Sequence, residues 1–458
     1  MSQPLIGPDD YLLGQALRAA SDTRSLTIGP GNRPEAAGVF AQVFGAQAAV
    51  IVADERTFEA AGRDVRESFR RAGHPWEPSI LFQPDVKAEL SRVEELCAAL
   101  SDVKAVPVAV GSGTINDLTK LAAHRLGRPY LVVATAASMD GYTAFGASIT
   151  HRGSKQTFEC PAPRAVVADL DVIAGAPEGM NAAGYADLLA KIPAGADWIV
   201  ADALGVEPIQ REPWEMVQGR LHDWVSNPDG VRTGDRGVLR NLVVGLMMTG
   251  FAMQASRSSR PASGAEHQFS HLWDMQHHIH EGAVPLHGFK VGIGTLAVLA
   301  LYETLCERDL ARIDVEAAVA RWPTLEQAEA RIAELFGTGD LASKALEETR
   351  AKHPSREALR VQLERLCGVW PALRQRLRDR LFSSGSARKV LRAAGCPVEP
   401  EDIGIGRDRL RLSYEHAYYI RRRFTVLDLA QRLGLADELL DRVFGTGEIW
   451  GRLRRRLL

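Results

Sequence analysis

A group of histidines in the middle of the chain offers ligands for a metal ion. The segment SGAEHQFSH places His267 and His271 four residues apart, so on a helix both imidazoles lie on one face. His287 follows in PLHGFK, where the adjoining glycine lets the chain bring this imidazole close to another element. Two imidazoles and one carboxylate, with positions left open, are typical of catalytic zinc sites. Asp187, in the otherwise small and apolar helix AAGYADLLAKI, is the best candidate for the carboxylate.

The neighbouring tract HHIH contains three further histidines, His277, His278 and His280. Their spacing gives no single face of a helix, and a lone histidine is more often a hydrogen-bonded interior or surface residue than a ligand. We therefore expect these three to lie outside the metal site.

A glycine-containing turn in VPVAVGSGTINDLTK is a candidate phosphate-binding element. Gly111 and Gly113 follow an apolar strand and precede a helix whose exposed N–H groups attract a phosphate. The GxG pattern alone is weak, because Ser112 or Thr114 can simply cap the helix. Asp54 ends an earlier strand, where a carboxylate can bind an adenosine ribose, and together these features indicate a dinucleotide. A carboxylate there repels a 2′-phosphate, which favours NAD over NADP.

Polar residues also follow the next strand, in ATAASMDGYTAF. Thr135, Ser138 and Asp140 lie in a loop at a strand's carboxyl end, where open α/β sheets bind ligands. A turn around the Asp-Gly pair at 140–141 explains the same composition equally well.

The elements that position these residues alternate along the first part of the chain. Apolar strands are predicted at 48–54, 79–82, 105–110 and 130–135, with helices at 56–72, 87–100 and 114–126 between them. This alternation is typical of a parallel sheet covered on both faces, so we predict a Rossmann-like α/β domain. A hairpin turning near residue 153 and one more strand complete it.

Beyond about residue 178, strand patterns nearly vanish. Helical spacing of apolar and charged residues dominates the segments at 179–191, 239–257, 292–308, 314–335 and 408–435. We therefore predict two domains, an α/β dinucleotide-binding domain at 1–177 and an all-helical metal- and substrate-binding domain at 178–458.

Composition narrows the class of protein and of partner. The 458 residues include 55 Lys plus Arg and 57 Asp plus Glu, so the net charge of −2 provides no field for nucleic acid or an anionic membrane. We expect a small-molecule substrate and no nucleic-acid or membrane partner. The N-terminal residues lack the pattern of a signal peptide, and the five cysteines form no CxxC pair, so we expect a cytoplasmic protein.

Together, these motifs resemble the glycerol-1-phosphate dehydrogenases, and more closely their bacterial branch. This family lies within the superfamily of dehydroquinate synthase, glycerol dehydrogenase and iron-dependent alcohol dehydrogenases. The resemblance covers roughly residues 25 to 435 and is carried by GSGTINDLTK, TAASMDGYTAFGASI, APRAVVADLDVIAGAP, AAGYADLLAK, SGAEHQFSH, PLHG and YIRRRFTVLDLAQRLG. It implies a dehydroquinate synthase-like fold and the interconversion of dihydroxyacetone phosphate and sn-glycerol 1-phosphate with NAD or NADP.

The resemblance also implies roles for individual residues. Asp187, His267 and His287 would hold one divalent metal, zinc or nickel, while Asp140, Asp187 and His271 would face the substrate, with Asp187 and His271 as catalytic residues. The dinucleotide would lie against Asp54, Gly111, Ser112, Gly113, Thr114, Ile115, Thr135, Ala136, Ala137 and Ser138. One position departs from the family pattern, since Ala144 stands where relatives usually carry a serine near the nicotinamide.

Three other functions compete with this hypothesis. A dehydroquinate synthase-like lyase and a glycerol or polyol dehydrogenase use the same cofactor and metal, and a non-catalytic nucleotide sensor would keep only the fold. The dehydrogenase hypothesis assigns the metal to polarising the ketone while hydride moves from the reduced nicotinamide. We also expect a homodimer.

Overall fold

The computed structural model describes residues 8–151, 154–177, 179–446 and 448–451. The chain folds into two compact units, each assembled from separate stretches of sequence. The first contains Met1–Leu188, Arg211–Ala262 and Ala393–Gly395, and the second contains Leu189–Gln210, Ser263–Arg392 and Cys396–Leu458. The domains expected at 1–177 and 178–458 stay a prediction, and the first unit takes in helices from beyond residue 178.

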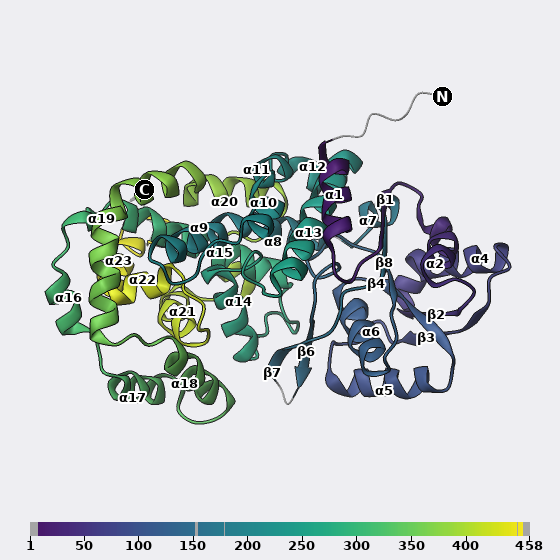
Figure 1. The fold of residues 1–458 in the computed structure, drawn as a ribbon, viewed down its shortest axis with the longest axis horizontal. Helices are drawn as coiled ribbons and strands as arrows, with labels where there is room; N and C mark the ends of the chain where they lie inside the picture. The colour runs from purple at the N-terminus through teal and green to yellow at the C-terminus, as the bar shows by residue number, and fades with distance from the viewer. Residues whose placement is uncertain (1–7, 152–153, 178, 447, 452–458) are drawn as a thin grey trace, which may run out of the picture. The chain divides into compact units, whose positions relative to one another are not determined.

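A six-stranded parallel sheet in the order β1-β8-β5-β4-β2-β3 forms the centre of the first unit (Figure 1). Its strands are β1 (Ser25–Gly29), β2 (Ala48–Asp54), β3 (Trp76–Phe82), β4 (Ala105–Gly111), β5 (Leu131–Ala134) and β8 (Ala165–Asp169). Every residue of β4, β5 and β8 is buried, which explains why these strands are apolar except for Asp169, the last residue of β8. The sheet confirms the predicted α/β fold class.

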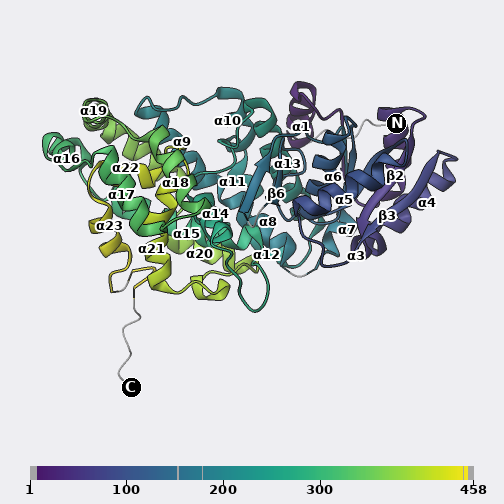
Figure 2. The same ribbon diagram turned by 90° about the horizontal axis from the view of Figure 1, so that it is seen from below.

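Helices cover both faces of this sheet. The chain moves in one direction across the sheet from β1 to β2 and β3, and then returns through β4 to β5. Because crossovers between parallel strands are right-handed, the two directions place their helices on opposite faces. Helices α2 (Ala36–Phe44) and α4 (Arg63–Arg71) pack together on one face (Figure 1), and α5 (Leu90–Ser101) and α6 (Gly113–Arg125) lie side by side on the other (Figure 2).

The remaining elements of the first unit comprise a hairpin and a set of helices. Strands β6 (Ala147–His151) and β7 (Ser154–Phe158) pair antiparallel, as predicted, with the turn at 152–153 outside the described residues. The other α-helices are α1 (Pro8–Ala19), α3 (Glu55–Thr57), α7 (Leu170–Ala174), α8 (Met180–Leu189), α10 (Arg211–Gln218), α11 (Leu221–Trp224), α12 (Pro228–Arg232) and α13 (Arg236–Ser256).

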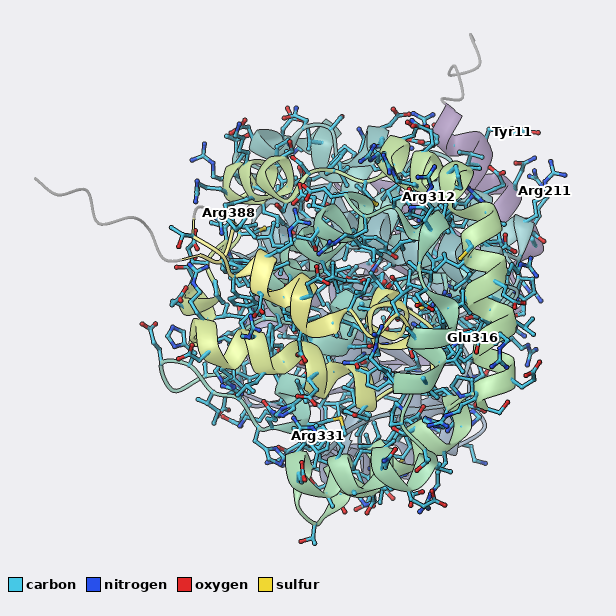
Figure 3. All side chains as sticks on the ribbon, turned by 90° about the vertical axis from the view of Figure 1, so that its left-hand side faces the viewer. Tyr11, Arg211, Arg312, Glu316, Arg331 and Arg388 are labelled. Carbon is cyan, nitrogen blue, oxygen red and sulfur yellow. The ribbon has the colours of Figure 1, made fainter. Side chains whose placement is uncertain are left out.

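The second unit contains helices and no strand among its described residues. Its α-helices are α9 (Lys191–Ala203), α14 (Ala265–Met275), α15 (His287–Cys306), α16 (Val315–Arg321), α17 (Leu325–Phe336), α18 (Asp340–Lys352), α19 (Arg356–Arg380), α20 (Ser384–Ala393), α21 (Arg407–Tyr419), α22 (Val426–Arg432) and α23 (Ala436–Val443). Charged side chains such as Glu316 and Arg331 point outward from this unit (Figure 3). The helical second half confirms the predicted fold class.

Two helices, α13 and α15, are long and apolar enough to cross a membrane by length and composition. In the most apolar stretch of each helix, 78% of the residues of α13 and 89% of those of α15 are buried inside the protein, as in the core helices of a soluble protein.

The structure corrects several predicted elements. β1 was not predicted, because SLTIG is short and its residues are all half-buried. The helix expected at 314–335 is two helices, α16 and α17, since Pro323 cannot continue the first and Thr324 caps the second. The helix expected at 408–435 is likewise divided, because Thr425 and Asp428 form a capping box that starts α22.

Candidate active site

The carboxyl ends of β2 and β4 mark the point where the chain reverses its direction across the sheet. β2 and β4 are neighbours, and the helices that follow them cover opposite faces of the sheet, which opens a crevice beyond their ends. Asp54 ends β2 and Gly111 ends β4, so the two candidate dinucleotide residues flank this switch point.

The turn after β4 has the geometry that phosphate binding requires. A Cβ at Gly111 would lie 2.6 Å from the Cβ of Ile115, so this close turn accepts only glycine. Ser112 stands at the N-cap position of α6, yet its hydroxyl makes no capping hydrogen bond. The first N–H groups of α6 are therefore not capped by Ser112, and they suit an anion.

Asp54 has a structural role beside the predicted one. Its Oδ1 accepts the backbone N–H of Thr57 at 2.8 Å, and the hydroxyl of Thr57 accepts the backbone N–H of Asp54 at 3.1 Å. This capping box fixes the carboxylate at the end of β2 and leaves Oδ2 for a ribose hydroxyl.

The predicted cofactor-binding stretch after β5, from Thr135 to Ser138, packs against α8. Thr135, Ala136 and Ala137 are buried, and the N–H of Ala137 donates to Oδ1 of Asn181 at 3.0 Å. A Cβ at Gly184 would lie only 1.7 Å from the carbonyl oxygen of Ala137, so the helix and the loop are in direct backbone contact. Ser138 is half-buried at the end of this stretch.

Asp140 and Asp187 are linked by a hydrogen bond. The backbone N–H of Asp140 donates to Oδ2 of Asp187 at 3.2 Å, and Asp187 is fully buried on α8. The predicted substrate carboxylate and the predicted metal carboxylate therefore belong to one connected arrangement.

The three histidines expected at the site come together on α14 and α15. His267 and His271 lie one turn apart on α14, with ring centroids 6.2 Å apart, and His287 is the first residue of α15. The ring of His287 lies 5.4 Å from that of His267 and 6.3 Å from that of His271.

Neighbouring side chains orient two of these rings. The buried carboxylate of Glu266 lies 2.8 Å from Nδ1 of His267, and the hydroxyl of Ser270 lies 3.3 Å from Nδ1 of His287. With Nδ1 engaged in this way, Nε2 is the ring nitrogen of each histidine that suits a metal ion, as is common for histidine ligands.

Ligand atoms of Asp187, His267 and His287 all lie within 4.8 Å of one another. One carboxylate and two imidazoles form a donor set that fits a divalent cation, with positions left for substrate. Within the described chain, His277, His278 and His280 take no part in this group. His278 is instead buried against Arg409 and the carbonyl oxygen of Ile403, as expected for an ordinary structural histidine.

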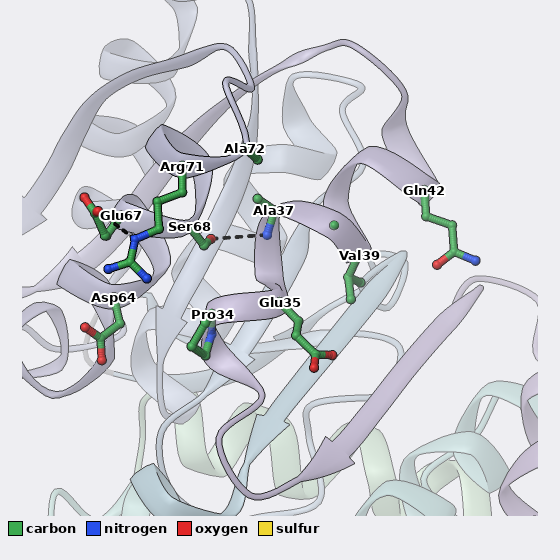
Figure 4. A pocket seen from close by; sticks show the side chains of 11 residues that line it. Pro34, Glu35, Ala37, Val39, Gln42, Asp64, Glu67, Ser68, Arg71 and Ala72 are labelled. Atoms are coloured by element: carbon green, nitrogen blue, oxygen red, sulfur yellow. Dashed lines mark hydrogen bonds and ion pairs between the residues drawn. The ribbon is translucent and has the colours of Figure 1, made fainter. Parts of the chain in front are cut away.

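A separate hollow of about 690 Å³ lies between α2 and α4 (Figure 4). Arg71 pairs there with Glu67 at 2.9 Å, and the hydroxyl of Ser68 accepts the N–H of Ala37 at 3.3 Å. It contains none of the predicted site residues.

Three residues that support the site were not among the predicted ones. Asn181, Glu266 and Lys120 each contact a predicted site residue or its loop, and all three lie inside motifs or helices already singled out. Glu266 directly precedes His267 in sequence, which was a usable signal. The other two depend on contacts between elements far apart in the chain.

Comparison with known proteins identifies the family. The sequence pattern of the iron-containing alcohol dehydrogenases matches residues 27–177. The chain is 30% identical over 383 residues to a glycerol-1-phosphate dehydrogenase (NAD(P)+) of Geobacillus thermodenitrificans, covering 82% of this chain and 85% of that relative. The chain belongs to the glycerol-1-phosphate dehydrogenase family. Membership confirms the resemblance inferred from the sequence motifs and places the protein among the oxidoreductases.

Further relatives carry the same description. A glycerol-1-phosphate dehydrogenase of Halalkalibacterium halodurans is 37% identical over 256 residues, which are 55% of this chain and 64% of that protein. The family member of Bacillus subtilis is 28% identical over 381 residues, which cover 82% of this chain and 84% of that protein.

Solved structures confirm the fold. A probable glycerol dehydrogenase from Sinorhizobium meliloti superposes with a TM-score of 0.58 at 16% identity, covering 91% of this chain and 97% of that one. A butanol dehydrogenase from Thermotoga maritima gives a TM-score of 0.56 at 15% identity, covering 90% and 96%.

Proposed function

We propose that this protein interconverts dihydroxyacetone phosphate and sn-glycerol 1-phosphate, using NAD or NADP and one divalent cation. The observation that carries the proposal is the grouping of Asp187, His267 and His287 in a chain of this family. The sheet's switch point, flanked by Asp54 and Gly111, supports a dinucleotide close to the carboxyl ends of the strands.

Each proposed ligand has a defined role at the cation. One carboxylate oxygen of Asp187 and one ring nitrogen of each histidine would hold zinc or nickel, since both metals accept this mixture of donors. When bound, the cation supplies Lewis-acid polarisation of the ketone, and the reduced nicotinamide supplies the hydride. His271 lies beside the two ligand histidines and is proposed to hold the proton that the substrate oxygen takes up, because imidazole titrates near neutral pH.

The cofactor is proposed to follow the edge of the sheet. Its pyrophosphate would lie on the turn from Gly111 to Ile115, and its adenosine ribose would bind the free oxygen of Asp54. The nicotinamide half would lie against the stretch from Thr135 to Ser138, next to Asp140. The carboxylate of Asp54 favours NAD over NADP, because it repels a 2′-phosphate.

The decisive experiment follows oxidation of NADH and of NADPH by the purified protein with dihydroxyacetone phosphate. The assay is run after treatment with a chelator and again after zinc or nickel is added back. We expect turnover that the chelator abolishes and the metal restores, with NADH preferred. Unphosphorylated dihydroxyacetone should be a much poorer substrate, because a site built for phosphate loses that binding energy.

Two histidine variants sharpen the result. H267N removes a proposed ligand, whereas H277N changes an exposed histidine of the same region at a positive φ of 53°, which asparagine tolerates. Loss of activity in H267N alone supports the assignment. Turnover that survives the chelator would refute the cation's role, equal use of dihydroxyacetone would indicate a polyol dehydrogenase, and binding of NADH without any turnover would indicate a sensor.

The homodimer and the cytoplasmic location expected from the sequence stay predictions. Size-exclusion chromatography with light scattering measures the first directly.

A further inference from the structure

Lys120 is a buried lysine in the interior of the first unit. Its side chain is 1% exposed on α6, in the motif NDLTK that follows the phosphate-binding turn. Removing an ammonium group from water is costly unless its three N–H donors find acceptors. Lys120 therefore needs strong partners.

Those partners all belong to one loop. Nζ of Lys120 donates to the carbonyl oxygens of Gly141 and Ala144 at 2.9 Å each, and to that of Gly146 at 3.1 Å. Three donors meet three acceptors within six residues of chain, so one side chain holds the backbone between Asp140 and β6 at three points.

The same loop is anchored at other points. The hydroxyl of Thr143 donates to the carbonyl oxygen of Met247 at 2.7 Å, and Nε2 of Gln254 donates to the carbonyl oxygen of Thr143 at 2.5 Å. The hydroxyl of Tyr142 donates to the carbonyl oxygen of Ala136 at 2.9 Å. These bonds connect the loop to α13 and to the stretch proposed to hold the nicotinamide.

We propose that Lys120 is a positioning residue that fixes Asp140 and the adjoining backbone for the substrate. Asp140 lies between two fixed groups, since its own N–H donates to Asp187 and the next carbonyl group accepts from Lys120. Displacement of a positioned reactive group by about 1 Å can lower catalysis by roughly 100-fold. The inference rests on the proposed function only where it assigns Asp140 to the substrate.

Ala144, which departs from the pattern that the family resemblance implies, provides one of these acceptors. Lys120 binds the carbonyl oxygen of residue 144, which every residue type provides. The Ala144 side chain is itself buried in a small apolar cluster with Met253 and Ala262. The loop at this position is therefore held through its backbone, and a serine hydroxyl is not needed to hold it.

The test compares K120M with T119V in the full-length protein. Methionine keeps the unbranched shape and removes all three donors. Thr119, the preceding buried residue of the same helix, has a hydroxyl with no partner among the described residues, so T119V controls for a general effect on α6. Hydrogen exchange of peptides covering 141–150 is measured without substrate, together with binding of NADH and kcat/KM for dihydroxyacetone phosphate.

We expect K120M to speed exchange in the loop by about 10-fold or more, with wild-type exchange in β4. We also expect kcat/KM to fall by about 100-fold while the Kd for NADH stays within about twofold, and T119V should resemble the wild type in every measurement. Wild-type exchange of the loop in K120M would overturn the proposal, as would an equal loss of NADH binding and turnover.

If K120M does not fold, K120Q takes its place, because glutamine keeps two N–H donors on a shorter side chain. The same changes in loop exchange, NADH binding and kcat/KM are then measured in K120Q. A wild-type protein that fails to turn over dihydroxyacetone phosphate refutes the proposed function. The exchange measurement still decides whether Lys120 holds the loop.

Discussion

Replacing Gly184 with alanine should displace part of the proposed cofactor site, although Gly184 is not one of the proposed cofactor-binding residues. Gly184 lies on α8, and the added Cβ would be 1.7 Å from the carbonyl oxygen of Ala137 and 2.7 Å from its carbonyl carbon. Real Cβ contacts do not fall below 3.0 Å, so the gap between helix and loop must widen by about 1.3 Å. Backbone atoms are the obstacle, and a rotamer change cannot relieve the contact.

The expected consequence is a specific loss of nicotinamide positioning. A shift of this size corresponds to a reduction in kcat/KM of roughly 100-fold, together with about 1–3 kcal/mol of overpacking strain. The assay combines NADH titration by fluorescence, steady-state kinetics and urea unfolding. The prediction applies to the stretch that contains Ala137, so affinity for NADH should fall as well.

Two glycine controls separate the site effect from general strain. A Cβ at Gly38, inside α2, meets nothing within 4 Å, so G38A should keep wild-type kinetics. A Cβ at Gly230 would lie 2.5 Å from the side chain of Val238, so G230A should lose stability while keeping its affinity for NADH. Wild-type NADH binding in G184A, or the same kinetic loss in G230A, would refute the reasoning.

Two further predictions concern the second unit. E266Q should weaken zinc binding by about 10-fold to 100-fold in competition with a chromogenic chelator, because Glu266 orients His267; unchanged affinity would contradict this role. Burial, assisted by the positive charge of Arg409, lowers the pKa of His278 below its usual 6.5, so the unfolded chain binds more protons and the free energy of unfolding should decrease as the pH falls below 6.5. The free energy of unfolding, measured with urea at several pH values in this range, should depend less on pH in H278Q than in the wild type. An unchanged dependence on pH would show that His278 does not contribute.

The sequence alone predicts the parts of this protein that depend on local pattern. Buried parallel strands such as β4 and β5 contain only apolar residues and small ones, so their sequences identify them without further information. The spacing of His267 and His271 is also a local pattern, and it places both side chains on one face of a helix. β1 escaped prediction because its residues are half-buried and its pattern is weak.

What the sequence could not show depends on contacts between distant elements. Helical periodicity predicts α13 but cannot show that it packs in the first unit, where Met247 and Gln254 hold Thr143. The sequence gives no sign that Lys120 is buried, because its three acceptors lie more than twenty residues away along the chain. Asp187 was chosen for the small and apolar residues around it, but the sequence alone could not show that its carboxylate lies beside His267 and His287.

The interrupted layout of the first unit has a consequence for synthesis on the ribosome. The loop at Thr143 receives its bonds from Met247 and Gln254, which are translated about a hundred residues later. The intervening Leu189–Gln210 belongs to the second unit, whose other segments begin only at Ser263. The emerging chain therefore cannot finish one unit before it starts the other, and an N-terminal fragment ending at residue 188 would expose an incomplete form of the proposed nucleotide site to chaperones and proteases.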